Sequence, residues 1–422
     1  MHIQPVYPAA IANGHVKEGI FLTISKVHSE QDARFPIHIF LIYVIFYAGH
    51  AFYNTYNTLF LYENGLTQEQ IGFINSIFTA ILIFIKPMWG VISDRSKNKA
   101  RIIGVLLIAN ALVCVAFYIS ASAYWLALCV ILYQFFFQPA YTLQESYTLE
   151  LMDKSRWDYG NIRLGGTLGY AVCAMFTGVL IGDDYGKIYW MMALLYGAAG
   201  VLQLFTKPIP GQRKKKEKIP YRQVFSHAPL ICIICFQLLS SLGSSFSMYY
   251  SIYFRHELGA PSELLGWMTT IGAISELPFF WYAGRIERKT GTHWFLAIAT
   301  SSIILKMVCL SFVTNPYLVL ALQVLSGMSV VSSSYCIIKY INDTVPAQMR
   351  TTAQMTNAII TTIFSTVICA PIVGWLDGLL GTQAVLLIGA GVSAVAVILF
   401  LLIFPAATRY QKKKEAALNT PS

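Results

Sequence analysis

The sequence predicts an all-α membrane protein with twelve transmembrane helices in two pseudo-symmetric six-helix halves. Of its 422 residues, 56% are hydrophobic and only 12% are charged, whereas soluble domains carry about 25% charged residues. The apolar residues also come in long blocks, and about 20 consecutive apolar residues are needed to cross a bilayer core. Lipid offers the backbone no hydrogen-bond partner, so these blocks must be helical.

Twelve apolar blocks are expected to span the membrane. In chain order they cover residues 37–62, 70–93, 101–120, 123–150, 161–182, 187–206, 229–255, 263–284, 292–313, 316–341, 352–376 and 383–405. The blocks and the segments between them divide the chain into a cytoplasmic N-terminal segment (1–36), an N-terminal half (37–206), a basic cytoplasmic linker (207–226), a C-terminal half (227–405) and a basic cytoplasmic tail (406–422).

The loop charges predict the orientation of these spans. With both termini in the cytoplasm, the inner loops and the tail hold 21 Lys and Arg, and the outer loops hold two. Positive charge collects in cytoplasmic loops, so this arrangement is strongly favoured and places the chain in the cytoplasmic (plasma) membrane. The net charge of +10 comes from basic runs in these inner loops and the tail, where they would anchor the chain at the lipid surface. We therefore expect no nucleic-acid partner.

The two halves resemble each other in sequence. Pro87 near the end of the second span and Pro278 in the eighth each stand seven residues before a charged turn. A repeated six-helix unit is a common plan for membrane carriers. The eight cysteines all fall inside apolar blocks, without the spacing of a zinc site or a disulfide framework, so we expect them to pack the helices and to hold no metal.

Polar stripes predict which spans face water. Lipid-facing helices are apolar all round, whereas helices beside an aqueous cavity carry polar residues at helical spacing. Stripes occur in the first, fourth, seventh and eleventh spans. With Lys86 of the second span added, they predict a shared cavity lined by Tyr47, His50, Asn54, Asn57, Lys86, Gln134, Gln138, Tyr141, Gln237, Ser241, Ser244 and Asn357. The alternative is that these side chains only join helices to one another.

A loop motif resembles a known family. Gly90, Asp94 and Arg95, followed by Lys99 and Arg101, resemble the G-x-x-x-D-R segment with following basic residues between helices two and three of the major facilitator superfamily. Segment 159–169, Y-G-N-I-R-L-G-G-T-L-G, is similar to a stretch in the subgroup of phenylpropionate permeases and nucleoside and lactose proton symporters. Segments 276–278 and 345–354 also resemble that subgroup.

The resemblance implies a fold and a mechanism. It implies alternating access between two halves, usually driven by protons. Five residues are then expected to form a conformational latch at the cytoplasmic helix ends: Gly90, Asp94, Arg95, Arg101 and Arg163. Gly165 stands where the subgroup has Trp, Thr167 where it has Ser, and Ser326 where His often precedes Gly. These departures bear on the substrate rather than on the fold.

Ionisable residues inside the spans indicate a coupling site, because each costs several kcal/mol in the bilayer centre. Glu276 lies nearest to the middle of a span and is the principal candidate for carrying a proton, with Glu145 as the second candidate. Glu145 has the alternative role of pairing with Arg163. Lys306 is expected to be paired and structural.

The expected function is secondary active transport of a small polar organic solute. A proton-coupled symporter for a sugar, a nucleoside or an aromatic carboxylate is favoured, working as a monomer with the proton gradient as its energy source and no cofactor. A proton-driven efflux carrier of the same fold is the alternative. An integral membrane enzyme is remote, because the chain has no H-E-x-x-H, G-x-S-x-G or phosphate-binding loop. A channel is more remote still, because no selectivity-filter segment is present.

Overall fold

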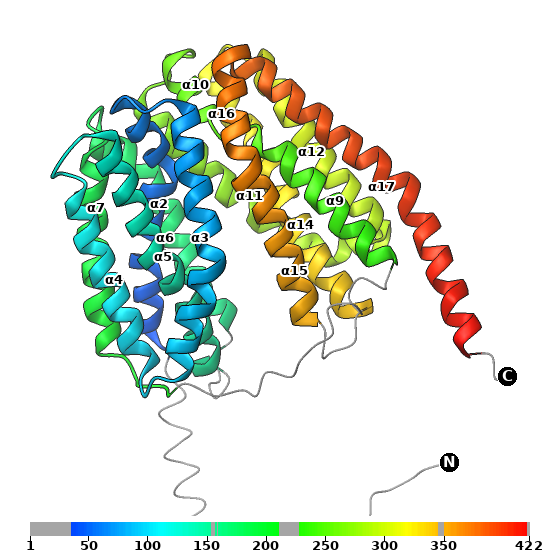
Figure 1. Cartoon of the computed structure of the whole chain (residues 1–422), viewed down its shortest axis with the longest axis horizontal. Coiled ribbons are helices and arrows are strands. Elements are labelled where there is room, and N and C mark those ends of the chain that lie inside the picture. Colours follow the sequence, from blue (N-terminus) through cyan, green and yellow to red (C-terminus); the bar gives the residue numbers. More distant parts are fainter. Residues whose placement is uncertain (1–34, 153–156, 158, 211–227, 345–349, 420–422) are drawn as a thin grey trace, which may run out of the picture.

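The computed structural model describes residues 35–152, 157, 159–210, 228–344 and 350–419, and every regular element in them is helical (Figure 1). The N-terminal half consists of α2 (Ile37–Glu63), α3 (Gln68–Asp94), α4 (Lys99–Ala116), α5 (Ala123–Met152), α6 (Tyr159–Ile181) and α7 (Lys187–Leu204). The C-terminal half consists of α9 (Ala228–Ser245), α10 (Tyr250–His256), α11 (Ser262–Thr290), α12 (Thr292–Phe312), α13 (Pro316–Leu322), α14 (Val324–Thr344), α15 (Arg350–Thr362), the π-helix η2 (Ile363–Ile368), α16 (Cys369–Leu380) and α17 (Thr382–Asn419).

Each predicted span corresponds to a helix or to a helix in pieces. The seventh comprises α9 and α10, the tenth α13 and α14, and the eleventh α15, η2 and α16. Within the described residues, ten segments are long and apolar enough to cross a membrane, and α7 and α11 are not among them. The last helix, α17, runs to Asn419 and so continues through part of the segment expected to be a cytoplasmic tail.

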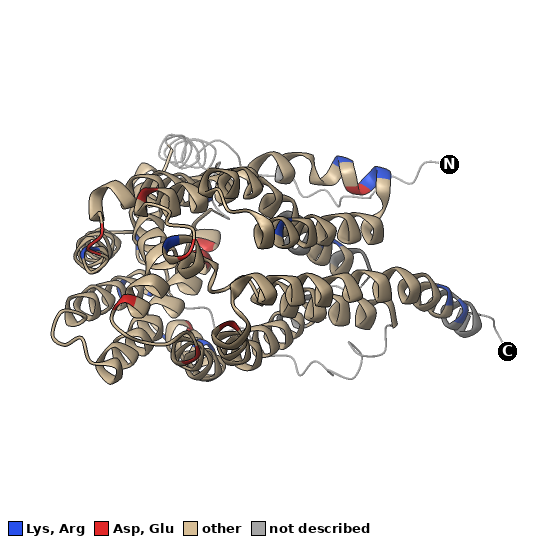
Figure 2. Ribbon diagram, turned by 90° about the horizontal axis from the view of Figure 1, so that it is seen from above, with Lys and Arg blue, Asp and Glu red and all other residues tan. Residues whose placement is uncertain are grey.

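Charged residues are sparse in the described part of the chain (Figure 2). Lys99 is buried and paired with Glu150 where α4 and α5 meet, and Lys339 pairs with Glu287 between α14 and α11 at 3.1 Å. The basic run at 213–218 and residues 345–349 of the resemblance motif lie outside the described residues.

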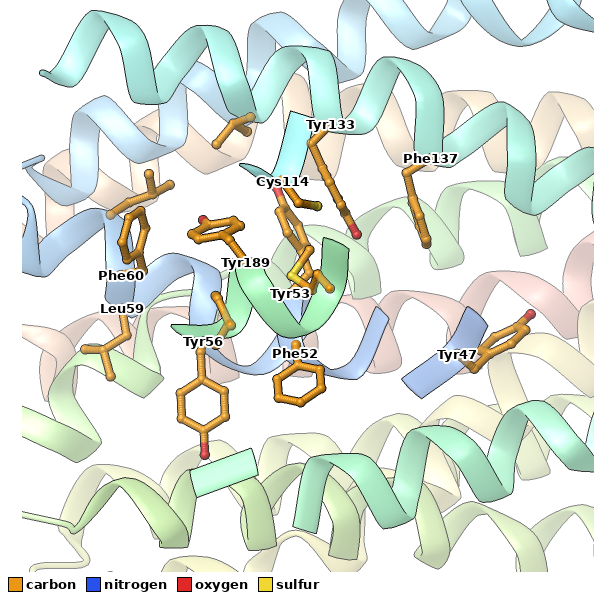
Figure 3. Packing of buried hydrophobic residues seen from close by; sticks show 14 of the residues in the cluster. Tyr47, Phe52, Tyr53, Tyr56, Leu59, Phe60, Cys114, Tyr133, Phe137 and Tyr189 are labelled. Carbon is orange, nitrogen blue, oxygen red and sulfur yellow. The ribbon is translucent and has the colours of Figure 1, made fainter. Parts of the chain in front are cut away.

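The core of the N-terminal half is aromatic (Figure 3). The rings of Tyr53 and Tyr133 stack with centroids 4.1 Å apart, and those of Phe117 and Tyr189 stack at 3.8 Å. Tyrosines bury large areas but need partners for their hydroxyl groups. The hydroxyls of Tyr133 and Tyr196 meet that need by bonding to each other at 2.8 Å. This half is therefore a packed unit around α2.

Glycines allow the helices of the two halves to touch. A Cβ on Gly266 of α11 would collide with the carbonyl oxygen of Ala174 on α6, and one on Gly178 would collide with the backbone of Glu263. Within the N-terminal half, a Cβ on Gly169 would meet the backbone of Val44. Small residues let membrane helices approach closely, so α6 is fixed against both α2 and α11.

The halves meet at one end of the bundle, which we call the closed end. There the hydroxyl of Tyr56 donates to the carbonyl of Ser262 at 2.8 Å, and Arg255 Nη2 donates to Asp183 Oδ1 at 2.7 Å. Towards the opposite end the two halves diverge (Figure 1). This open end carries the α3–α4 turn and the residues that follow α7. The structure is thus closed on one side and open on the other.

The π-helix is anchored where the halves meet. An i→i+5 turn leaves backbone carbonyls available to other donors. Ser76 on α3 uses two of them: its hydroxyl lies 3.1 Å from the carbonyl oxygen of Thr366 and 2.8 Å from that of Val367. The irregular backbone of the eleventh span is therefore fixed to the N-terminal half.

Candidate functional site: a polar cavity between the halves

A cavity of about 560 Å³ lies between the halves and is lined from both of them. From α2, α5 and α6 the lining residues are Tyr47, His50, Asn54, Phe137, Gln138, Tyr141, Arg163, Gly166, Thr167 and Tyr170. From the other half they are Met268, Thr269, Gly272, Ala273, Glu276, Gln323 and Ser326. A cavity of roughly 300–1,000 Å³ suits a small organic molecule.

The wall formed by α2, α5 and α6 combines aromatic faces with hydrogen-bonding groups. Asn54 donates to the Tyr170 hydroxyl at 2.8 Å. The His50 ring stacks on Phe137 with centroids 4.7 Å apart, and its buried Nδ1 has no hydrogen-bond partner among the described residues. Such a wall can stack against an apolar part of a solute and bond to its polar groups.

Arg163 contributes the cation of this wall. Its guanidinium lies 4.3 Å from the centroid of the Tyr47 ring, within the range of a cation–π contact. Its Nε is 3.8 Å from Glu145 Oε1, and the Tyr47 hydroxyl also reaches that oxygen at 3.4 Å. Arg163 and Glu145 thus form the pair that the sequence offers as an alternative role for Glu145, and Arg163 lines the cavity whereas Glu145 does not.

Glu276 faces the cavity from α11. It is half-buried, and Pro278 lies inside the same helix two residues later. Proline removes a backbone donor and frees a carbonyl one turn earlier. The adjacent Ser275 is buried and meets α14 so closely that a Cβ on Gly327 would collide with its backbone. Glu276 therefore follows directly after a residue that is packed where α11 crosses α14.

A second cation lies behind the opposite wall. Lys306 on α12 donates to Gln323 Oε1 at 2.8 Å and to Ser326 Oγ at 2.7 Å. Both acceptors line the cavity. The sequence predicts that Lys306 is paired, and its partners prove to be an amide and a hydroxyl.

The structure brings five of the twelve predicted lining residues together: Tyr47, His50, Asn54, Gln138 and Tyr141. The other seven lie outside this cavity: Asn57, Lys86, Gln134, Gln237, Ser241, Ser244 and Asn357. The α2 and α5 stripes thus face the cavity in part, whereas the stripes of α9 and α15 do not reach it.

Hydrogen bonds explain several of the residues outside. Asn57 is buried and accepts the Tyr189 hydroxyl at 2.8 Å, and Gln134 bonds to Tyr53 at 3.3 Å. Ser241 donates to the carbonyl of Gln237 on its own helix at 2.8 Å, and Ser244 donates in the same way to Ser240. Asn57 and Gln134 therefore join helices, as the alternative expects, whereas the two serines bond within their own helix.

Lys86 and Asn357 lie away from the cavity for different reasons. Lys86 is exposed on α3, towards the end where the halves diverge. Asn357 is buried, and its side-chain oxygen has no partner among the described residues. Neither side chain lines the cavity between the halves.

The predicted latch residues lie at the open end, apart from Arg163. Asp94 ends α3, and Asp94, Arg95 and Arg101 are exposed. A Cβ on Gly90 would meet nothing within 4 Å, so no other described helix approaches Gly90 closely in this state. Their role as a latch stays a prediction for the state in which this end closes.

Several lining residues carry no stripe that sequence reasoning could detect. Gly166, Gly272 and Ala273 are too small to mark a polar face, and Tyr170 stands alone. Thr167 and Ser326 differ from the residues that the similar subgroup has at these positions. That difference was the one sequence feature that could have indicated their place in the cavity.

These features define a class. A helical membrane bundle in two halves, with a polar cavity between them that is open at one end, is the architecture of a solute transporter. The chain belongs to the MFS_1 like family, whose model matches residues 37–376. It is therefore a membrane transporter of the major facilitator superfamily and not an enzyme, which confirms the resemblance.

Curated relatives support this membership. The maltose permease of Geobacillus stearothermophilus is 25% identical over 328 residues, covering 76% of this chain and 81% of the relative. The raffinose permease of Escherichia coli is 24% identical over 317 residues, with 69% and 74% covered. The probable 3-phenylpropionic acid transporter of Escherichia coli (strain K12) is 23% identical over 272 residues, with 61% and 69% covered.

Solved structures show the same fold. The nucleoside transporter NupG superposes with a TM-score of 0.73 at 16% identity, covering 87% of this chain and 98% of NupG. A bacterial homologue of the lysosomal transporter Spinster, in an inward-facing and occupied conformation, superposes with a TM-score of 0.68 at 11% identity, covering 88% and 96%. At these identities the likeness establishes the fold alone.

Proposed function

We propose that this protein is a proton-coupled symporter that moves a small polar organic solute across the cytoplasmic membrane by alternating access. The observation that carries the proposal is the placement of Glu276 in the cavity between the halves. A carboxyl group in a membrane span is costly and is retained where it serves ion pathways or proton relays. Alternate exposure to the two sides would let it bind a proton on one side and release it on the other.

The cavity lining supports a polar organic cargo. Amide, hydroxyl and guanidinium groups stand among aromatic rings, so a solute with an apolar face and polar edges finds partners on both halves. The relatives named above are a maltose permease, a raffinose permease and a probable 3-phenylpropionic acid transporter. A sugar, a nucleoside or an aromatic carboxylate therefore remains the class of cargo, and the protein is proposed to work as a monomer without a cofactor.

The direct test is transport by purified protein in proteoliposomes. An inward proton gradient should drive uphill accumulation of a labelled solute from a panel of sugars, nucleosides and aromatic acids, and a protonophore should abolish it. Accumulation against an outward proton gradient would instead identify the efflux alternative. Movement that only equilibrates each solute, at any gradient, would contradict proton coupling.

A further inference from the structure

The membrane-embedded lysine Lys306 has only neutral partners. Its ammonium group is held by the Gln323 amide oxygen at 2.8 Å and the Ser326 hydroxyl at 2.7 Å. The side chain is half-buried within α12, which crosses the apolar zone. Among the described residues no carboxylate lies within ion-pair distance of it. An ammonium has three donors, so one remains for a further acceptor.

A cation in this position is expensive unless an anion compensates it. Charged groups inside a membrane are almost always paired, and a buried charge without its partner is strongly destabilising. Two other described cations within the helices have such a partner: Arg163 faces Glu145, and Lys99 faces Glu150. Lys86 has no ion pair among the described residues, but it is exposed on α3. Lys306 lies one side chain behind a cavity wall, where a solute can supply the missing negative charge.

The net charge of the groups around the cavity depends on whether Glu276 is ionised. Arg163 from α6 and Glu145 from α5 compensate each other. The charged groups that remain are Glu276 on α11 and Lys306 on α12. His50 from α2, stacked on Phe137, is counted here as a neutral imidazole. With Glu276 ionised the remaining pair sums to zero, whereas with Glu276 protonated the cavity carries one uncompensated positive charge.

We propose that the cargo is an organic monoanion, with its carboxylate at the Gln323–Ser326 edge in front of Lys306. The inference rests on the proposed function and narrows its substrate class. The anion restores neutrality when Glu276 takes up a proton, so one anion and one proton bind together. The aromatic wall of α2, α5 and α6 receives the apolar body of the anion. Net transport is then electroneutral, because the two charges cancel.

Matched probe pairs test the site by binding. The purified protein is mixed with 3-phenylpropionate, phenylacetate or butyrate, or with the neutral amide of each, and its melting temperature is recorded, since a bound ligand raises it. We expect at least one carboxylate to raise the melting temperature, with its amide and maltose having no effect. Lys306→Met should weaken binding of that carboxylate at least tenfold, and Lys306→Arg should retain it within a few-fold.

The controls separate this site from general electrostatics and from misfolding. Lys86→Met removes the other lysine considered for the cavity and should bind the carboxylate like the wild type, since Lys86 does not line the cavity. Lys306→Gln provides a second neutral variant if Lys306→Met fails to fold. Equal binding of a carboxylate and its amide, unchanged binding in both neutral variants, or no response to any carboxylate would overturn the inference.

Transport distinguishes failure of this inference from failure of the proposed function. Proteoliposomes should accumulate the bound carboxylate under a pH gradient, at a rate that an imposed membrane potential leaves unchanged. Proton-driven accumulation of maltose but of no carboxylate would overturn the anion site while upholding proton-coupled transport. Carboxylate binding without accumulation under any gradient would uphold the site and contradict proton-coupled transport.

Discussion

Arg255 Nη2 lies 2.7 Å from Asp183 Oδ1 and joins the two halves of the protein across its closed end. Asp183 also accepts a hydrogen bond from the Ser262 hydroxyl at 3.1 Å. Asp183 lies between α6 and α7, whereas Arg255 and Ser262 belong to α10 and α11. These contacts must break when the closed end opens, so they stabilise the state described here relative to the opposite one.

Removing the charge of Asp183 should favour opening of that end. Exposed ion pairs are worth about 0–1 kcal/mol, and Asp183 is 80% exposed. Asp183→Asn should therefore shift the equilibrium by at most about fivefold. The measurement is the rate at which a reagent applied on the side of the closed end labels a cysteine placed at Thr269, a residue of the cavity lining. Asp184→Asn is the matched control because, among the described residues, the ion pair of Asp184 is with Lys187 of its own half, at 3.9 Å. Equal labelling in both variants would remove Asp183 from the gate.

The orientation of the protein follows from loop charge and can be tested directly. We expect probes at Gln212 and after Lys414 to react only from the cytoplasm, and a probe in 183–186 to react only from outside. The open end would then face the cytoplasm. This is measured by labelling single-cysteine variants with a membrane-impermeant thiol reagent, in intact cells and in inverted vesicles. Labelling of positions 212 and 183 from the same side would contradict the twelve-span topology.

Polar residues of the cavity should contribute to solute binding. Asn54→Ala removes the donor to Tyr170, and Gln138→Ala removes an amide from the wall. Each should weaken binding by roughly 1–3 kcal/mol, the cost of leaving a buried polar group without its partner. Isothermal titration with the identified solute measures the change. Gln237→Ala serves as the control, because Gln237 lies outside the cavity. Wild-type affinity in both cavity variants would assign these side chains to helix packing.

Asp94 should act on the rate of the conformational change and leave binding intact. It is exposed at the end of α3, where the halves are apart in this state and must meet in the other. Asp94→Asn is expected to slow uptake while keeping the dissociation constant within a few-fold of wild type. Uptake rates and equilibrium binding are measured on the same preparation. An unchanged uptake rate would exclude Asp94 from the mechanism.

The helices could be predicted from sequence because bilayer thickness and backbone hydrogen bonding leave few alternatives. The first span, 37–62, corresponds to α2 at 37–63, and the second, 70–93, lies within α3 at 68–94. Apolar length cannot show where a span is interrupted, so the π-helix at 363–368 was not predicted. Its backbone depends on Ser76, almost 300 positions away in the sequence.

The cavity could be predicted only in part, because a polar stripe shows that a helix has a polar face without showing what the face meets. His50 and Asn54 face the cavity. Ser241 and Ser244 lie on an equally regular stripe, yet they bond to carbonyls of their own helix. Gly272 shows the converse, since a residue without a side chain borders the cavity and leaves no polar signal.

Glu276 is the proposed coupling group, and its neutral isostere separates coupling from movement of the carrier. Glu276→Gln mimics the protonated carboxyl group, so the two halves should still alternate around a bound solute. Glu145→Gln is the comparison and is expected to be milder, because Glu145 lies 3.8 Å from Arg163 and chiefly compensates its charge.

The measurement that tests the central claim most directly compares two assays on Glu276→Gln in proteoliposomes: accumulation driven by a proton gradient, and exchange of labelled for unlabelled solute without a gradient. The account predicts that accumulation is abolished while exchange continues at a rate close to wild type. Uphill accumulation at the wild-type rate would contradict it and would move the coupling role to Glu145.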